Sequence, residues 1–88
     1  MTVFVDASAL ISMIAGEPDG RELANRLDAE RKRLVSALSV WEAFAGLRRS
    51  HDLPLDAARA RIRAFLDAAD LSFVAIGELE FEIAADAY

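Results

Sequence analysis

Two acidic residues stand where a metal site for phosphodiester chemistry could form. Asp6 directly follows the apolar run 2–5, and Glu42 follows a second apolar run, 34–38. If these runs are neighbouring parallel strands, both carboxylates rise from the same edge of the sheet, where ligands of open α/β sheets bind. Like charges held close repel each other unless a cation lies between them. Because Mg²⁺ typically takes one or two carboxylates and keeps several waters, the pair suits this ion.

Each acid also has a purely structural explanation. Asp6 stands just before a predicted helix, where Asp is a common N-cap. The segment from Ser39 to Glu42 has the form of a capping box, with Ser39 as the N-cap and Glu42 three residues later. Ser8 can orient the Asp6 carboxylate or make a local hydrogen bond. The residues alone leave the catalytic and the structural explanations open.

Other kinds of chemistry find little support. The chain has no cysteine and one histidine, His51, so any metal must be held by oxygen ligands, which favours Mg²⁺ or Mn²⁺. Gly16 and Gly20 lack the spacing of a phosphate-binding loop. We expect Trp41 and Phe44, at helical spacing, in the core rather than in a base-stacking platform. The remaining acids fall on helix surfaces or loops, where a solvated role is expected.

Composition indicates one folded domain over residues 1–88. The chain is 55% hydrophobic and 28% charged, which is typical of a globular protein. The formal charge of −5 argues against nucleic-acid binding when taken alone, but the arginines are clustered. No apolar run approaches the roughly 20 residues needed to span a bilayer, and no signal peptide is visible. We therefore expect a cytoplasmic protein without a membrane segment.

Hydrophobic periodicity predicts the order β-α-α-β-α-α-β-α. The expected strands are 2–5, 34–38 and 71–76, and the expected helices are 7–15, a helix opened by residues 17–19, 39–50, 55–69 and 78–88. Strands that alternate with helices indicate an α/β fold with a mainly parallel sheet and right-handed crossovers.

These segments resemble a known family. Residues 3–10, an apolar strand followed by Asp-Ala-Ser-Ala-Leu, are similar to the opening of PIN-domain ribonucleases of the VapC toxin type. Gly-Glu-Pro at 16–18 resembles the turn between that family's first two helices. Residues 34–43 resemble its second strand and Glu-bearing helix, and 84–88 resemble a later helix. The resemblance covers the whole chain and implies a three-layer α/β/α fold.

The resemblance also implies an activity. VapC-type toxins are Mg²⁺- or Mn²⁺-dependent endoribonucleases, usually homodimers, silenced by a cognate antitoxin. Asp6 and Glu42 match the positions of the first two metal-binding acids, and Ser8 matches the polar residue that supports the first. PIN domains continue further, with a third acid, often a fourth, and additional strands. We therefore expect a C-terminally truncated domain with three strands and about five helices, and weak or no cleavage by these residues alone.

Two other functions stay open. A truncated PIN fragment could act as a non-catalytic module that binds an antitoxin or another partner. Alternatively, a small α/β regulatory domain would use Asp6 only as an N-cap and Glu42 only in a capping box. Tight antitoxin binding without metal-dependent cleavage would favour the first, and metal affinity that is unchanged in Asp6→Asn would favour the second.

Overall fold

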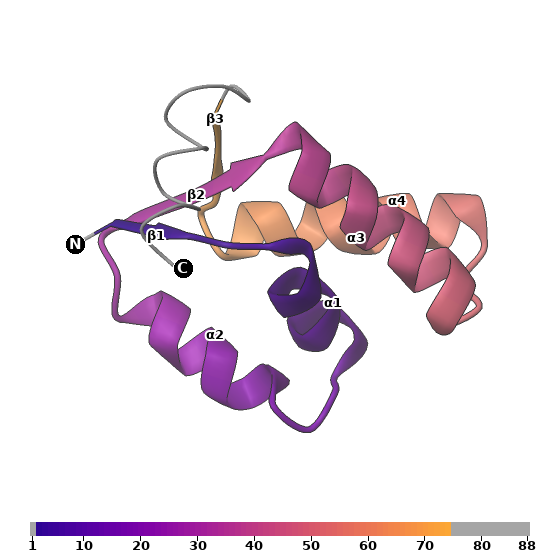
Figure 1. Cartoon of the computed structure of the whole chain (residues 1–88), viewed down its shortest axis with the longest axis horizontal. Coiled ribbons are helices and arrows are strands. Elements are labelled where there is room, and N and C mark those ends of the chain that lie inside the picture. The colour runs from indigo at the N-terminus through magenta and orange to yellow at the C-terminus, as the bar shows by residue number, and fades with distance from the viewer. Residues whose placement is uncertain (1, 75–88) are drawn as a thin grey trace.

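The computed structural model describes residues 2–74, which form an open α/β sheet covered by helices (Figure 1). The elements, in chain order, are β1 (Thr2–Phe4), α1 (Ala7–Ala15), α2 (Gly20–Asp28), β2 (Lys32–Ser36), α3 (Ala37–Ser50), α4 (Leu55–Ala68) and β3 (Ser72–Val74). This order confirms the predicted alternation as far as β3. The expected helix 78–88 lies outside the described residues.

The three strands are parallel and lie in the order β1-β2-β3. In the register, Phe4 is paired with Leu34 and Leu34 with Ser72, so β2 is the central strand of the described sheet. Both crossovers step in the same direction, and right-handed crossovers then place their helices on one face. Figure 1 shows α1 and α2 below the strands, and α1 also packs against α3 and α4. The described residues therefore form two layers of the predicted fold.

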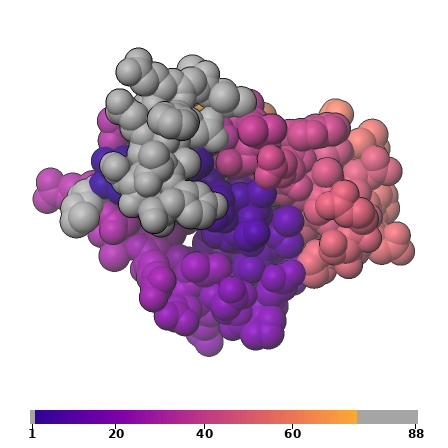
Figure 2. Space-filling model, viewed as in Figure 1, coloured from indigo at the N-terminus to yellow at the C-terminus, as the bar shows by residue number. Residues whose placement is uncertain are grey.

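The core lies between the sheet and the first and third helices. Leu10 of α1, Val35 of β2 and Leu47 of α3 are all fully buried. In the space-filling view, α1 occupies the middle of the molecule, with α2 and α3 beside it (Figure 2). Burying each such side chain contributes on the order of 1.5–3 kcal/mol to stability. The burial of Leu10 therefore holds α1 against the sheet, and with it the position of Asp6 between β1 and α1.

Helix α1 ends as the sequence predicts. Gly16 is its C-cap, in the left-handed region at φ 73°, where glycine carries no steric cost. The next helix begins later than expected, because Pro18 precedes it and Asp19 is its N-cap. Close contact with α1 explains why α2 starts with a glycine, because a Cβ on Gly20 would collide with the Ser12 carbonyl oxygen.

The second strand is displaced from its predicted position by two residues at each end. It spans Lys32–Ser36 rather than 34–38, and α3 begins at once with Ala37. Arg33, in this strand, donates to the backbone carbonyls of Glu30, Asp28 and Ala69. These bonds tie the entry of β2 to the end of α4 and help to set the strand register.

No helix within residues 2–74 is both long enough and apolar enough to cross a membrane.

Candidate metal site at the carboxyl edge of the sheet

Asp6 is the N-cap of α1. Its backbone is extended at φ −85° and ψ 172°, and its Oδ1 accepts a hydrogen bond of 2.8 Å from the backbone N–H of Ala9. The side chain is exposed, and within residues 2–74 no hydrogen bond reaches Oδ2. The cap therefore fixes the orientation of the carboxylate and leaves its second oxygen open to solvent.

The N-cap of α3 is Ser36, and the prediction that Ser39 fills this role is wrong. Ser36 is fully buried, and its Oγ accepts a 3.0 Å hydrogen bond from the backbone N–H of Ser39. Its hydroxyl also donates to the Ser39 Oγ at 3.0 Å. Because Ser36 is still paired with Val74 in the sheet, the helix can begin only after it. The predicted capping box between Ser39 and Glu42 therefore does not exist.

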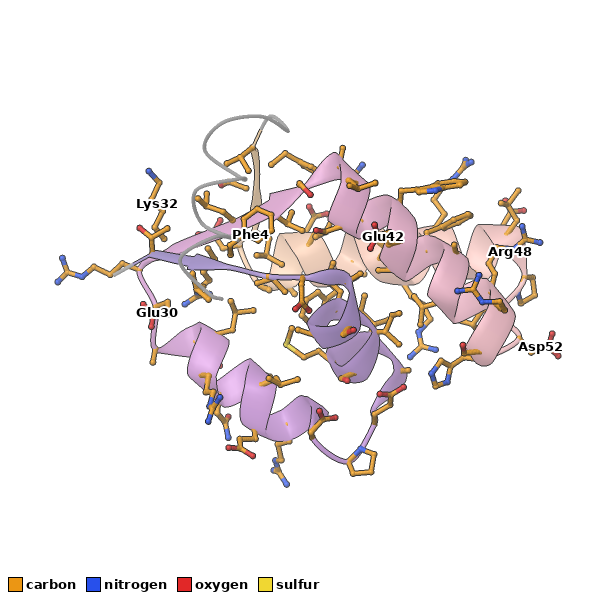
Figure 3. All side chains as sticks on the ribbon, viewed as in Figure 1. Phe4, Glu30, Lys32, Glu42, Arg48 and Asp52 are labelled. Atoms are coloured by element: carbon orange, nitrogen blue, oxygen red, sulfur yellow. The ribbon has the colours of Figure 1, made fainter. Side chains whose placement is uncertain are left out.

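Glu42 consequently lies in the second turn of α3 rather than in the first. It is exposed and has neither a hydrogen bond nor an ion pair with any residue in the described part of the chain. Figure 3 shows it on the first half of the helix, with Arg48 at the far end. Because Glu42 does not take part in capping α3, the structural role that the sequence suggested for it is absent.

The two acids follow neighbouring parallel strands, as predicted. Phe4 is paired with Leu34, and the Val5 N–H continues the ladder by donating to the Leu34 carbonyl at 2.9 Å. Two residues further on, Asp6 and Ser36 therefore occupy equivalent positions at the carboxyl edge of the sheet. Each is an N-cap, so α1 and α3 begin beside one another at this edge.

Contacts between α1 and α3 place Glu42 on the side of α3 that faces α1. The two helices pack against each other, and a Cβ on Gly46 would lie 2.5 Å from the Ile11 Cδ1 atom. Glu42 is four residues before Gly46 and therefore lies one turn nearer the sheet on the same stripe of the helix. Asp6 lies at the corresponding end of α1. Both acids therefore lie on helices that begin at the same edge of the sheet.

The chemistry of the two acids suits a hard cation. Ionised carboxylates are the form that binds a hard cation such as Mg²⁺, so the donor set fits such an ion. No group of three or more potential metal ligands occurs among residues 2–74, so a metal site in this part of the chain would have at most two such side chains as ligands.

Ser8 does not hold Asp6 in this structure. It is the second residue of α1, it is exposed, and none of the hydrogen bonds within residues 2–74 involves its side chain. The Asp6 carboxylate is instead held by the Ala9 backbone N–H. A supporting role for Ser8 stays a prediction.

His51 takes part in a network that the sequence did not reveal. Its Nε2 lies 2.9 Å from Glu17 Oε2, and the Ser12 hydroxyl donates to Glu17 Oε1 at 3.0 Å. Because the serine bonds to the glutamate rather than to the imidazole, this arrangement does not activate a nucleophile. It ties the turn after α1 to the C-terminus of α3.

Comparison with known proteins agrees with this architecture. A search of curated proteins returns no match. The model of the family described as PIN domain matches residues 3–88, and PIN domains are generally metal-dependent nucleases. The match includes the strand before Asp6, the helix that carries Glu42 and the parallel sheet that joins them. This chain belongs to the PIN domain family.

Proposed function

We propose that the chain is a metal-dependent endoribonuclease of the VapC toxin kind, with Asp6 and Glu42 as ligands of one Mg²⁺ or Mn²⁺ ion. The observation that carries this proposal is the state of Glu42. It is an exposed acid without a bonding partner in residues 2–74, and its helix begins at the same edge of the sheet as Asp6. Membership of a nuclease family supports the choice of reaction.

Each residue has a defined part in this proposal. A bound divalent ion polarises a phosphoryl oxygen and lowers the pKa of a coordinated water, which is the chemistry that phosphodiester hydrolysis requires. Asp6 presents Oδ2 in a fixed orientation, because Oδ1 is held by Ala9. Glu42 presents its carboxylate from α3, a helix that is packed into the core through the fully buried Leu47. The two helix N-termini favour the anionic substrate at the same edge.

The proposal extends to partners through the resemblance to VapC toxins. We propose that the substrate is RNA, that a cognate antitoxin silences the enzyme, and that two copies associate as a homodimer in the cytoplasm. Ser8 is proposed to support the Asp6 carboxylate once a metal is bound.

A non-catalytic interaction module is the second candidate. It is favoured by the small number of ligands: residues 2–74 contain no cluster of three or more metal-binding side chains, whereas three or four acids usually share this chemistry. Under this alternative, the chain binds a protein partner tightly and cleaves no RNA in the presence of Mn²⁺.

Cleavage of a fluorogenic single-stranded RNA in Mg²⁺ or Mn²⁺ tests the proposal. We expect slow cleavage that stops with EDTA and is lost in both Asp6→Asn and Glu42→Gln. Asp19→Asn is the control for the first change, because Asp19 is also a helix N-cap but makes no side-chain cap bond. Glu22→Gln is the control for the second change, because Glu22 is an exposed acid on α2, away from the proposed site. Cleavage that persists in both site variants would contradict the assignment.

A further inference from the structure

Four large hydrophobic side chains are exposed within residues 2–74. They are Leu38, Trp41, Leu55 and Phe73. The last three line a single groove of about 410 Å³ between α3, α4 and β3. Scattered exposed apolar residues need no explanation, but a concentration along one groove marks a binding surface.

Trp41 is the most exposed of these side chains. It is 63% exposed, which contradicts the expectation that it lies in the core. Its ring is stacked on Phe44, with ring centroids 5.7 Å apart and planes 25° apart. Phe44 is half-buried and packs against the core, so it supports the indole from beneath. Most of the indole surface is therefore held in place and open to a ligand.

Two arginines line the same groove. Arg59 and Arg63 are one turn apart on α4, and both are exposed. Neither forms a hydrogen bond or an ion pair with another residue in the described range 2–74. By contrast, Arg61, between them in sequence, donates to the Ile14 carbonyl at 2.6 Å. In a chain with a net charge of −5, two guanidinium groups along one groove, without a partner among residues 2–74, supply a local positive edge that suits an anion.

We infer that this groove binds a single-stranded segment of RNA, with a base stacked on Trp41 and phosphates at Arg59 and Arg63. Aromatic faces beside arginines are the common platform for unpaired nucleotides, since every base has a stacking face and every linkage an anion. The inference rests on the proposed function for the identity of the ligand. It adds a substrate-holding surface on α3, the helix that also carries Glu42.

The two groove arginines, which have no partner within residues 2–74, favour RNA over an apolar protein partner. A protein helix in this groove would have to supply an acid to each guanidinium group, whereas successive phosphates of one strand meet this need without a special sequence. Duplex RNA should bind poorly, because its bases are stacked on one another and cannot reach the indole.

Trp41 is the only tryptophan in the chain, so its fluorescence reports directly on the groove. We would titrate the whole protein with a short unlabelled single-stranded RNA in EDTA, which prevents cleavage and separates binding from Asp6 and Glu42. We expect saturable quenching by single strands, little quenching by a duplex of the same sequence, and weaker binding as salt rises.

Variants then separate stacking from charge. With labelled RNA, Trp41→Ala should weaken binding about 10-fold or more, which is the scale of one lost base stack, and Trp41→Phe should weaken it less. Arg59→Gln and Arg63→Gln should each reduce the slope of log affinity against log salt by about 0.7, the value for one phosphate of a single strand. Arg21→Gln, an exposed arginine on α2, is the control and should change neither quantity.

Several results would overturn the inference. These are an absence of RNA binding, RNA binding without a change in Trp41 fluorescence, and unchanged affinity in folded Trp41→Ala and Arg59→Gln variants. A blue shift of the emission that grows with protein concentration would show instead that a second copy covers the groove. If Asp6→Asn abolishes cleavage but keeps the quenching, both proposals stand. Quenching without cleavage in either Mg²⁺ or Mn²⁺ would support RNA binding in the groove and contradict the proposed nuclease activity.

Discussion

Replacing Gly20 with alanine tests the packing that positions α1 beneath the sheet. A Cβ on Gly20 would overlap the Ser12 carbonyl oxygen and lie 3.0 Å from its carbon and 3.3 Å from the Met13 Cα. All three atoms belong to the backbone of α1, which cannot turn aside as a side chain can. The added methyl group must therefore push α2 away from α1.

The expected loss follows from two opposing effects. Adding volume to a well-packed interior typically costs about 1–3 kcal/mol. Replacing glycine in a helix recovers about 0.5–1 kcal/mol of backbone entropy, and less at the first residue of a helix, where Gly20 stands. We therefore expect Gly20→Ala to lower the free energy of unfolding by about 1–2 kcal/mol, or roughly 4–16 °C in Tm for a domain of this size.

Gly46→Ala is the matched control. The new Cβ would lie 2.5 Å from the Ile11 Cδ1 atom, which is the far end of a flexible side chain. Displacing the Ile11 side chain from its rotamer by about 30° costs about 0.5–1.5 kcal/mol, and the gain in helix propensity offsets about 1 kcal/mol of it. Thermal and urea unfolding, followed by circular dichroism, should show Gly46→Ala near the parent protein. If Gly20→Ala is as stable as the parent, or less damaging than Gly46→Ala, the described α1–α2 contact is wrong.

Three further changes test single features of the fold. Asp6→Ala should destabilise the chain by about 1 kcal/mol in thermal melts, because it removes the α1 cap, whereas Asp6→Asn should cost only a few tenths; equal losses would argue against the cap. Leu47→Ala should cost about 2–5 kcal/mol in urea unfolding, since Leu47 is fully buried, and a loss below 1 kcal/mol would contradict that burial. Arg33→Met should cost about 1–3 kcal/mol by leaving backbone carbonyls unpaired, and unchanged stability would show that water replaces these bonds.

Local patterns predicted the parts of the fold that depend on few residues. The Asp6 cap, the end of α1 at Gly16 and the apolar face of α4 each follow from a motif within one or two turns. Helical spacing predicts an apolar face on α4 from Leu55 to Ala69. Ala58, Ile62 and Leu66 of this face are buried, whereas Leu55, at the start of the helix, is exposed. The order of the strands also follows, because alternating strands and helices leave few topologies.

The boundary between β2 and α3 could not be predicted in this way. Ser36 and Ser39 are equally good N-cap residues by type, and both stand near the end of an apolar run. Pairing of Ser36 with Val74, which is distant in sequence, keeps Ser36 in the strand and so decides between them. The same long-range contact determines that Glu42 is free of a capping role, which is the feature on which the proposed site depends.

The surroundings of Trp41 and His51 were equally inaccessible to local patterns. An aromatic residue at helical spacing is usually buried, but α4 packs beside α3 so that Phe44 reaches the core and Trp41 does not. The contact of His51 with Glu17 joins residues that are far apart in sequence. Both features depend on how the helices are arranged, so the aromatic and cationic groove could be recognised only in the folded chain.

Whether Asp6 and Glu42 bind one ion is the central question, and paramagnetic Mn²⁺ answers it most directly. In amide NMR spectra, low Mn²⁺ concentrations should broaden the signals around Asp6 and around Glu42 together and with the same concentration dependence. Glu42→Gln should then remove the broadening near Asp6, although residue 6 is unchanged. Glu22→Gln should leave both effects intact. Broadening near Asp6 that persists in Glu42→Gln, or broadening spread evenly over the acidic surface, would contradict a shared metal site.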